Sequence, residues 1–297
     1  MLMVILMELI SNYMLDDNLR HKLNELTQET FSFDFENWVT RGYFKGEYIP
    51  YSYLENDKII ANASANIMTF LLGNQIKTYI QIGTVMTKKE YQNNHLASNL
   101  INHIINEYKD KCDGIYLFGD ISALEFYGKF GFQEVSETKY YLKEKYINSN
   151  KTMSFDIVKE NDIELINKYL DYVENAIPYG YFDQINKFGL HMFYTQDFNN
   201  IYYSKKLDAF IILKHEENSL KLLSVITKRY IPLNEIISNI DIPYSNFELG
   251  FAPQKEDQIM FDTQSYNGGE DYRLFIMGDD LKNIEIEKLI FPTFSHA

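Results

Sequence analysis

Residues 84–101 read Thr84-Val-Met-Thr-Lys-Lys-Glu-Tyr-Gln-Asn-Asn-His-Leu-Ala-Ser-Asn-Leu-Ile, an apolar segment followed by a polar loop and an amphipathic segment. From Leu96 onward apolar residues recur at the spacing of one buried helix face, and we expect Asn93 or Asn94 to cap this helix. The first amides of such a helix lack internal partners and can bind a phosphate or pyrophosphate. This signal is weak by itself, because nearly every strand–loop–helix unit offers the same amides.

The flanking segments predict a sheet around this helix. Three short apolar runs, separated by the turn signals Glu55-Asn-Asp and Gly73-Asn, predict consecutive antiparallel strands at residues 48–53, 59–70 and 77–86. The apolar run at residues 1–10 is compatible with a strand or a short helix. We also expect a helix at residues 16–27, a buried strand at 115–118, a helix at 122–129 that stops at Gly131, and a strand at 132–142.

The second half of the chain follows a similar order of elements. Asn148-Ser-Asn-Lys-Thr is the best linker candidate, because it is polar and prone to turns. Beyond it we expect strands and helices at residues 155–158, 162–173, 209–213, 220–226, 233–240 and 247–251. We therefore predict two domains, residues 1–146 and 152–297. The predicted class is α/β (α+β), with a mixed, largely antiparallel sheet flanked by helices in the first domain and a smaller α/β second domain.

Composition excludes several functional classes. The formal charge of −14 argues against non-specific nucleic-acid binding; it fits a cationic partner, but many acidic proteins need such charge only for solubility. Cys112 is the only cysteine, which excludes an intrachain disulfide and a cysteine-based zinc site, and we expect no metal. The apolar start lacks a basic region and a cleavage site, and no segment offers the ~20 apolar residues that span a bilayer. We expect a cytoplasmic protein without membrane attachment.

A second segment, Asp120-Ile-Ser-Ala-Leu-Glu-Phe-Tyr-Gly-Lys-Phe-Gly-Phe, changes the interpretation of the first. Together the two resemble, over roughly residues 45–142, the acetyl-CoA site of the GNAT superfamily of N-acetyltransferases. The family pattern Tyr-Arg-x-x-Gly-x-Ala is matched by Tyr91, Gln92, Asn93, Asn94, His95, Leu96 and Ala97. The later pattern Asn-x-x-Ala-x-x-Phe-Tyr-x-x-x-Gly-Phe is met by Asp120, Ala123, Phe126, Tyr127, Gly131 and Phe132.

This resemblance implies a role for each matched position. Val85, Met86 and Thr87 would form a splayed strand end that pairs with pantetheine and polarises the thioester. The coenzyme pyrophosphate would meet the amides at Gln92, Asn93, Asn94, His95, Leu96, Ala97 and Ser98, with Asp120 also at the coenzyme site. Tyr127 would protonate the leaving thiolate. The implied activity is direct transfer of an acetyl group from acetyl-CoA to a primary amine in a ternary complex.

Several features leave alternatives open. His95 replaces the pattern's Gly and could either crowd the phosphate or turn outward, and Gln92 replaces Arg. The alternative is therefore a catalytically weak acyl-CoA binder or a structural pseudo-acetyltransferase. The acceptor is a small-molecule or peptide amine: a polyamine, an aminoglycoside-like antibiotic, an amino acid or a protein N-terminus, with acidic charge favouring a polycation. The oligomeric state is left open.

The general base and the second half are less defined by the sequence. Glu47, Glu55 and Glu125 are base candidates only by residue type, and a chain of water molecules would also serve. Where the second half would place a phosphate loop, it has Ile231-Pro-Leu. We expect a degenerate GNAT-like domain that has lost coenzyme binding, packs over the first domain and shapes the acceptor cleft.

Overall fold

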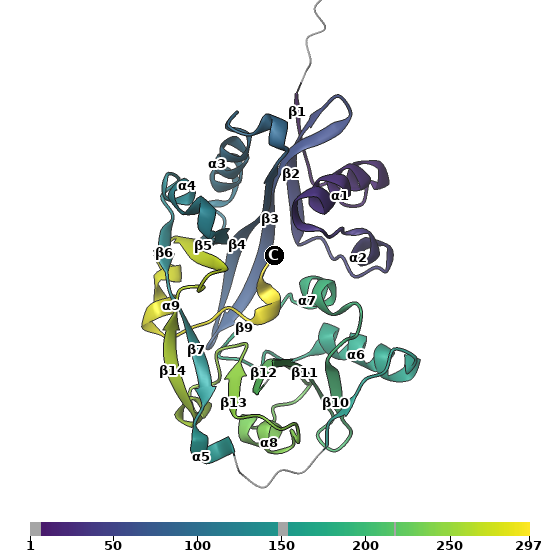
Figure 1. Ribbon diagram of the computed structural model, residues 1–297, viewed down its shortest axis with the longest axis vertical. Helices are drawn as coiled ribbons and strands as arrows, with labels where there is room; N and C mark the ends of the chain where they lie inside the picture. The colour runs from purple at the N-terminus through teal and green to yellow at the C-terminus, as the bar shows by residue number, and fades with distance from the viewer. Residues whose placement is uncertain (1–6, 148–153, 217) are drawn as a thin grey trace, which may run out of the picture.

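The computed structural model describes residues 7–147, 154–216 and 218–297, and these form two sheets flanked by helices (Figure 1). The predicted linker at residues 148–152 and the first residues of the N-terminal apolar run lie outside the described residues. Most strand pairs in both sheets are antiparallel, so the predicted fold class is confirmed. No described helix is both long and apolar enough to cross a membrane.

The first sheet has eight strands and contains the three predicted antiparallel strands. Six of its strands run in the order β1 (Glu8–Ser11), β2 (Tyr48–Glu55), β3 (Lys58–Leu72), β4 (Gln75–Thr87), β5 (Gly114–Asp120) and β15 (Tyr272–Met277). The short strand β6 (Gln133–Val135) follows at the edge beside β15, and β9 (Phe182–Gln184) pairs with the end of β3. The long strands β3 and β4 contribute the largest pairing, which runs from Ala61–Thr87 to Leu72–Gln75.

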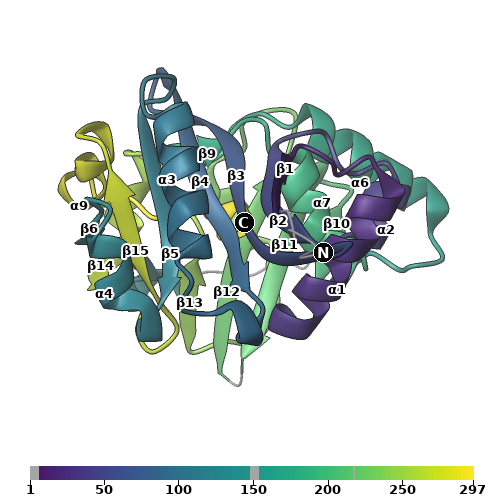
Figure 2. The ribbon, with the colours of Figure 1, turned by 90° about the horizontal axis from the view of Figure 1, so that it is seen from above.

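Helices cover both faces of this sheet (Figure 2). Helix α3 (Leu96–Tyr108) buries Leu100, Ile101 and Ile104 against one face, as the helical spacing predicts. On the other face lie α1 (Asp17–Phe31) and the short α2 (Glu36–Thr40), in a cluster with Trp38. The neighbouring residues Ile59 and Ile60 of β3 enter these two different clusters, as the period of two in a strand requires.

The second sheet has seven strands. Its order is β14 (Phe261–Tyr266), β7 (Glu137–Leu142), β13 (Asn246–Leu249), β12 (Ser219–Ile226), β11 (Ala209–Glu216), β10 (Ile201–Ser204) and β8 (Asp156–Ile157). The remaining α-helices are α4 (Leu124–Gly128), which packs on the first sheet, and α5 (Glu144–Ile147), α6 (Ile163–Asn175), α7 (Phe188–Thr195), α8 (Leu233–Ser238) and α9 (Asn283–Ile286).

Each sheet contains a strand from the other half of the chain. The expected single strand at residues 132–142 is wrong: it breaks at Ser136 into β6 and β7, which belong to different sheets. Strand β15, from near the end of the chain, lies between β5 and β6. The division into residues 1–146 and 152–297 stays a prediction, and the sheets cross it in both directions.

Glu137 lies at the junction of the two sheets. Its Oε1 accepts a hydrogen bond from Phe291 N at 2.8 Å, and its Oε2 accepts one from the Tyr272 hydroxyl at 3.1 Å. Burial raises the pKa of this carboxyl to about 7, while the two hydrogen bonds and Lys221 act in the opposite direction. The side chain therefore ties β7 to two segments from the last thirty residues of the chain, at the cost of a buried acidic group.

Candidate active site

Strands β4 and β5 diverge and leave a gap in the middle of the first sheet. They pair in parallel only from Tyr79–Gly114 to Gln81–Tyr116, and beyond this the two strands separate. The cause is a bulge in β4, where Thr84 and Val85 together lie opposite Ala63 and Thr84 adopts a φ of +42°. The edge of β4 that follows the divergence has no partner strand among the described residues, so its peptide groups can pair with a ligand.

A side chain from β3 holds the bulge in place. Asn62 is fully buried, and its Nδ2 donates to Thr84 O at 2.9 Å. The Thr84 hydroxyl also hydrogen-bonds the Tyr48 hydroxyl at 2.8 Å and Ser64 Oγ at 2.9 Å. A buried network of this kind fixes the backbone at Val85, the first of the three predicted pantetheine-pairing positions.

The predicted helix cap is wrong by one or two residues. The N-cap of α3 is His95, without a side-chain cap, and Asn94 Nδ2 instead donates to Tyr91 O at 3.1 Å. Asn93 and His95 both adopt left-handed conformations, with φ values of 65° and 58°, which turns the chain once more before the helix begins. The first helical hydrogen bond runs from Asn99 N to His95 O at 2.9 Å. The amides of the preceding first turn therefore lack helical acceptors: Leu96, Ala97 and Ser98.

The conformation of His95 explains why the family pattern has Gly at this position. A left-handed conformation costs an L-residue roughly 1–2 kcal/mol, and Gly avoids this cost. His95 is exposed at the start of the helix and makes no side-chain cap. Gln92 is also exposed, and its Nε2 lies 3.5 Å from Thr87 O, at the end of β4.

Tyr127 lies across the gap from the bulge, on α4. Its ring packs on Phe275 of β15, with centroids 5.4 Å apart, and lies directly over Gly119 of β5. A Cβ at Gly119 would be 2.7 Å from Tyr127 Cε2, so the absence of a side chain there makes room for the phenol. Burial raises the pKa of Tyr127 to about 12, with a smaller contribution from Asp120. The phenol is therefore protonated at neutral pH.

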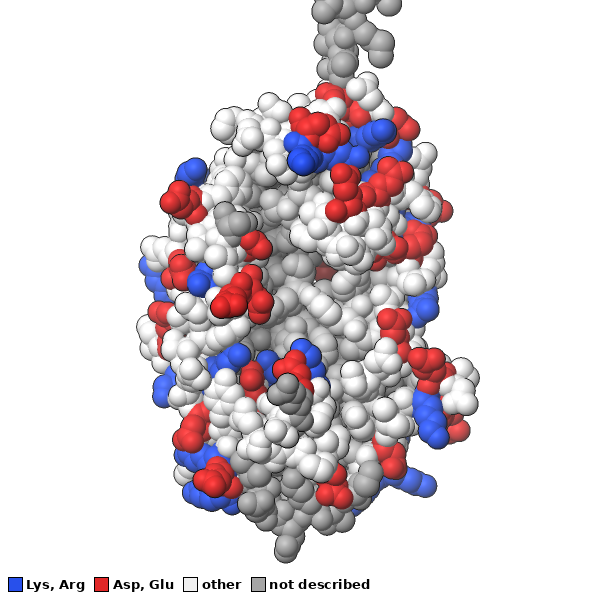
Figure 3. All heavy atoms as spheres, viewed as in Figure 1, with Lys and Arg blue, Asp and Glu red and all other residues white. Residues whose placement is uncertain are grey.

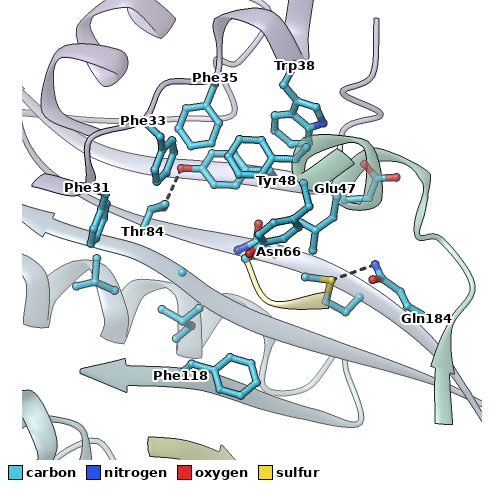
Figure 4. Close-up of a pocket in the computed structure, with 18 of the residues that line it drawn as sticks. Phe31, Phe33, Phe35, Trp38, Glu47, Tyr48, Asn66, Thr84, Phe118 and Gln184 are labelled. Carbon is cyan, nitrogen blue, oxygen red and sulfur yellow. Dashed lines mark hydrogen bonds between the residues drawn. The ribbon is translucent and has the colours of Figure 1, made fainter. Parts of the chain in front are cut away.

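One cavity, with a volume of about 360 Å³, joins the gap to the interior between the two halves of the chain (Figure 4). Three predicted site residues line it: Val85, Asp120 and Tyr127. Met86 does not line it; its side chain is buried in the cluster that packs around α1 and α2. The other lining residues come mainly from α1, α2, β2, β3, α7 and the segments beside them, and are mostly apolar: Phe31, Phe33, Phe35, Trp38, Tyr48, Met68, Ile82, Phe118, Leu190, Phe193 and Tyr194.

Of the three candidate bases, only Glu47 lines this cavity. Glu55 accepts a hydrogen bond from the Tyr91 hydroxyl, and Glu125 is exposed on α4. No sequence signal marks Gln184 and Asn186, which reach the cavity from β9 and the loop after it. Gln184 follows Tyr-Phe-Asp and carries no motif, and β9 is too short to show a periodicity.

The face that carries this cavity is hollowed between the two halves (Figure 3). Uncharged side chains cover most of the hollow, and Asp and Glu residues lie around it. In residues 7–147, 154–216 and 218–297, no group of three or more His, Cys, Asp or Glu side chains could hold a metal ion. The polar groups on the cavity wall include the Tyr127 phenol, the carboxylates of Glu47 and Asp120, and the side-chain amides of Asn66, Gln184 and Asn186.

Comparison with known proteins identifies the first half. Residues 20–135 match the family described as "Acetyltransferase (GNAT) domain". No curated protein matched the sequence. The resemblance to the GNAT superfamily is therefore confirmed by the family match in the first half of the chain.

Solved structures with a similar fold cover nearly the whole chain. A probable N-acyltransferase from Enterococcus faecalis V583 has a TM-score of 0.55 and 13% identity over 91% of this chain and 72% of its own. Eis1 from Mycobacterium abscessus has a TM-score of 0.56 and 10% identity over 93% and 74%. A GCN5-related N-acetyltransferase from Anabaena variabilis ATCC 29413 has a TM-score of 0.54 and 14% identity over 91% and 72%. At these identities the likeness concerns the fold alone.

Proposed function

Because residues 20–135 form a GNAT acetyltransferase domain, we propose that the protein transfers an acetyl group from acetyl-CoA to a primary amine. The observation that carries this proposal is the gap between β4 and β5, with Tyr127 on one side and the bulge at Val85 on the other, both lining one cavity. An apolar cavity with a few converging polar groups is the usual form of a small-molecule site.

In this proposal the coenzyme follows the open edge of β4. Its pyrophosphate lies at the first-turn amides of α3 (Leu96, Ala97 and Ser98), where the positive end of the helix dipole favours a phosphate. Its pantetheine pairs with the residues from Val85 to Thr87, and one of their amides polarises the thioester carbonyl. The proposal requires the exposed His95 side chain to lie away from these amides.

The chemical step needs alignment more than covalent assistance. The neutral amine attacks the carbonyl carbon, a tetrahedral intermediate forms, and backbone donors stabilise its oxyanion. The carbon–sulfur bond then breaks and the thiolate takes a proton from Tyr127, while the attacking nitrogen releases one proton, which restores the phenol. The high pKa of Tyr127 suits this role only in a buried site, because the same burial raises the basicity of the thiolate.

The test is release of free coenzyme A thiol from acetyl-CoA in the presence of a panel of primary amines, beside a measurement of acetyl-CoA binding by thermal shift. We expect amine-dependent thiol release and a raised Tm with the coenzyme. Stabilisation by acetyl-CoA without thiol release from any amine would favour the alternative, an acyl-CoA binder without turnover. The absence of both effects would refute the proposal.

A further inference from the structure

One side of the cavity is a continuous row of aromatic rings. Ring centroids are 6.0 Å apart between Phe31 and Phe33 and 5.3 Å apart between Phe33 and Phe35. Trp38 continues the row at 6.0 Å from Phe35, and Figure 4 shows these four rings in succession. Phe193 of α7 packs against the last three of them, with centroid distances of 5.5 to 5.9 Å. Rings from two separate parts of the chain therefore form one surface of the cavity.

This aromatic row runs from the surface of the protein to the reacting groups. Phe31 at its outer end is 47% exposed, whereas Phe35 and Trp38 are each 3% exposed. Phe35 packs on Tyr48 with ring centroids 4.8 Å apart, and the Tyr48 hydroxyl hydrogen-bonds Thr84 Oγ1 in the bulge at 2.8 Å. Through Tyr48 the inner rings are thus connected to the bulge where the thioester is proposed to lie. A small molecule with a short chain can contact both.

The aromatic row and the helix proposed to bind the coenzyme lie on opposite faces of the first sheet. Phe35 and Trp38 belong to the cluster around α1 and α2, whereas α3 packs on the other face. In the proposed function the pyrophosphate lies at the start of α3, so the coenzyme reaches the gap from that face. This arrangement leaves the aromatic part of the cavity to the acceptor.

Most polar groups on the cavity wall are already engaged with the protein itself. The indole N–H of Trp38 donates to a carbonyl oxygen of α7 at 2.7 Å, and the Tyr194 hydroxyl also donates to a backbone carbonyl. The Asn186 side chain donates to the backbone of β3 and accepts from it, each at 2.8 Å. Glu47 Oε2 and Gln184 Oε1 have no accessible surface, so they are not presented to a ligand. An acceptor rich in hydroxyl groups would lose its hydration here for few new partners.

The charges on the wall also narrow the choice of acceptor. No Lys or Arg among the described residues lines the cavity, so the carboxylate of an amino acid would find no cation there. Burial raises the pKa of Glu47, and backbone hydrogen bonds and Lys45 act in the opposite direction, so this carboxyl already has partners. The apolar rings favour the neutral form of a bound amine, which is the form that attacks a thioester. These features fit an acceptor with one amine and an apolar body.

On the basis of the proposed function, we propose that the acceptor is an arylalkylamine, whose aromatic ring packs on the aromatic row while its primary amine attacks the thioester at the gap. Several rings of the row meet edge to face, with interplanar angles of 87° between Phe33 and Phe35 and 74° between Trp38 and Phe193. A further aromatic ring can extend such an array and gains more than a saturated ring of the same size. The cavity volume of about 360 Å³ lies at the lower end of small-molecule sites, in keeping with one ring and a short chain.

The transfer itself follows the course given for the proposed function. The amine nitrogen forms the amide bond with the carbonyl carbon, and the carbon–sulfur bond breaks. The thiolate takes a proton from Tyr127, which regains one from the attacking nitrogen. The products are the N-acetylated arylalkylamine and coenzyme A.

The first experiment measures thiol release from acetyl-CoA with benzylamine, phenethylamine and phenylpropylamine, beside cyclohexylmethylamine and glucosamine. We expect kcat/KM to pass through an optimum at one linker length and to exceed that of glucosamine at least tenfold. Benzylamine should exceed its saturated counterpart, cyclohexylmethylamine, about threefold, because only the aromatic ring can pack edge to face. Equal kcat/KM for all five amines, or a preference for glucosamine, would overturn the inference while acetyl transfer stands.

Variants of the row test the contact directly. Phe33→Leu and Phe193→Leu each keep an apolar side chain but remove the ring, and should reduce the ratio of benzylamine to cyclohexylmethylamine to near one, mainly through KM. Tyr230→Leu, which removes an exposed ring after β12, is the matched control and should leave the ratio unchanged. An unchanged ratio in both cavity variants would contradict packing of the substrate on this row.

The single tryptophan of the chain gives a readout that needs no turnover. Because Trp38 is the only tryptophan and lines the cavity, its fluorescence should change saturably as phenethylamine binds. If no amine releases thiol, the proposed function fails and this titration decides the inference. Saturable binding that Phe193→Leu weakens would then support the aryl site. A Trp38 signal that does not respond to any of the aryl amines would overturn it.

Discussion

The two sheets contain the same local unit, a strand, a helix and a parallel strand, in two different states. In the first sheet the unit is β4–α3–β5 and in the second it is β12–α8–β13, and these are the two parallel pairings among the described strands. Both pairs of strands make only a short ladder, so both could open a gap. Only the first does.

The difference lies in what fills the space before each helix. The residues before α3 are polar and exposed, and several amides there lack helical acceptors. Before α8, Ile231 and Leu233 are 0% exposed, and Pro232 between them has no amide hydrogen. The topology thus offers a gap twice, and local sequence decides whether it stays open to a ligand.

The gap beside β13 is also closed by the chain itself. Gly250 N donates to Leu222 O at 2.8 Å and Gly250 O accepts from Thr293 N at 2.9 Å. A Cβ at Gly250 would lie 2.3 Å from Thr293 Oγ1, so a segment near the end of the chain packs tightly where a ligand would otherwise enter. This contrast between the open and the filled unit leads to four predictions.

The largest effect is expected from Tyr127→Phe in the open unit. Loss of a positioned proton donor typically lowers kcat about 10²–10⁴-fold, and affinity for acetyl-CoA should hardly change, since the ring remains. Thiol release and coenzyme titration check this. Tyr230→Phe, after β12 in the filled unit, is the matched control and should retain full turnover. Equal activity of wild type and Tyr127→Phe would remove Tyr127 from the mechanism.

Glu137, at the junction of the two sheets, should make the free energy of unfolding depend on pH. Its folded pKa of about 7 lies above the ordinary value of 4.5, so protonation favours the folded state. This stabilisation is fully present below pH 4.5 and is lost as pH rises through 7. A pKa difference of about 2.5, at about 1.4 kcal/mol per unit, corresponds to about 3.5 kcal/mol.

Glu137→Gln isolates this contribution. The difference in unfolding free energy between wild type and variant, from urea titrations across this range, should fall steadily with rising pH. Burial lowers the pKa values of His191 and His296 to about 3, which gives the opposite dependence, but both proteins share it and it cancels. A difference that does not vary with pH would contradict the assignment to Glu137.

A negative charge introduced at the start of α3 or of α8 should distinguish an effect on coenzyme binding from an effect on helix stability. Ala97→Asp places a carboxylate beside the proposed pyrophosphate and should weaken acetyl-CoA binding roughly tenfold by repulsion. It should also stabilise α3 by about 0.3–1 kcal/mol through the helix dipole. Asn234→Asp in α8 should have the second effect without the first. Equal coenzyme affinity in all three proteins would place the pyrophosphate elsewhere.

The smallest effect is expected from His95→Gly. Relief of the left-handed conformation, less the entropy that Gly loses on folding, should stabilise the protein by about 0.5–1 kcal/mol. Asn93→Gly should gain less, because Asn tolerates this conformation better. Thermal denaturation measures both. A destabilised His95→Gly variant would mean that the imidazole makes a stabilising contact.

The sequence revealed those elements whose pattern is local. Strands β2 to β4 and helix α3 were predictable because alternation and helical spacing extend over many residues. Strand β15 was not predictable. Nothing in Tyr-Arg-Leu-Phe-Ile-Met indicates which strand it pairs with, and its partner β5 lies some 150 residues earlier in the chain. The break at Ser136 was not predicted either. It is visible only from the pairing of β6 and β7, which belong to different sheets.

The candidate site was predictable where a motif marks it. Tyr127 and Val85 follow from the resemblance and line one cavity, while their proposed roles remain to be tested. The N-cap at His95 was not predicted, because His is not a residue type that indicates a left-handed conformation. Glu47 was one of three equal candidates, and only its place on the cavity wall distinguished it.

The exchange of strands sets an order for synthesis on the ribosome. Among the described strands, β6 pairs only with β15, and β7 pairs with β13 and β14. Residues 133–142 therefore find these partners only after more than a hundred later residues have been made. The ring of Tyr127 likewise gains its contact with Phe275 only at that stage. A nascent chain therefore leaves the segment from Tyr127 to Leu142 without its final contacts, and its strand edges unpaired, until almost the whole polypeptide has emerged.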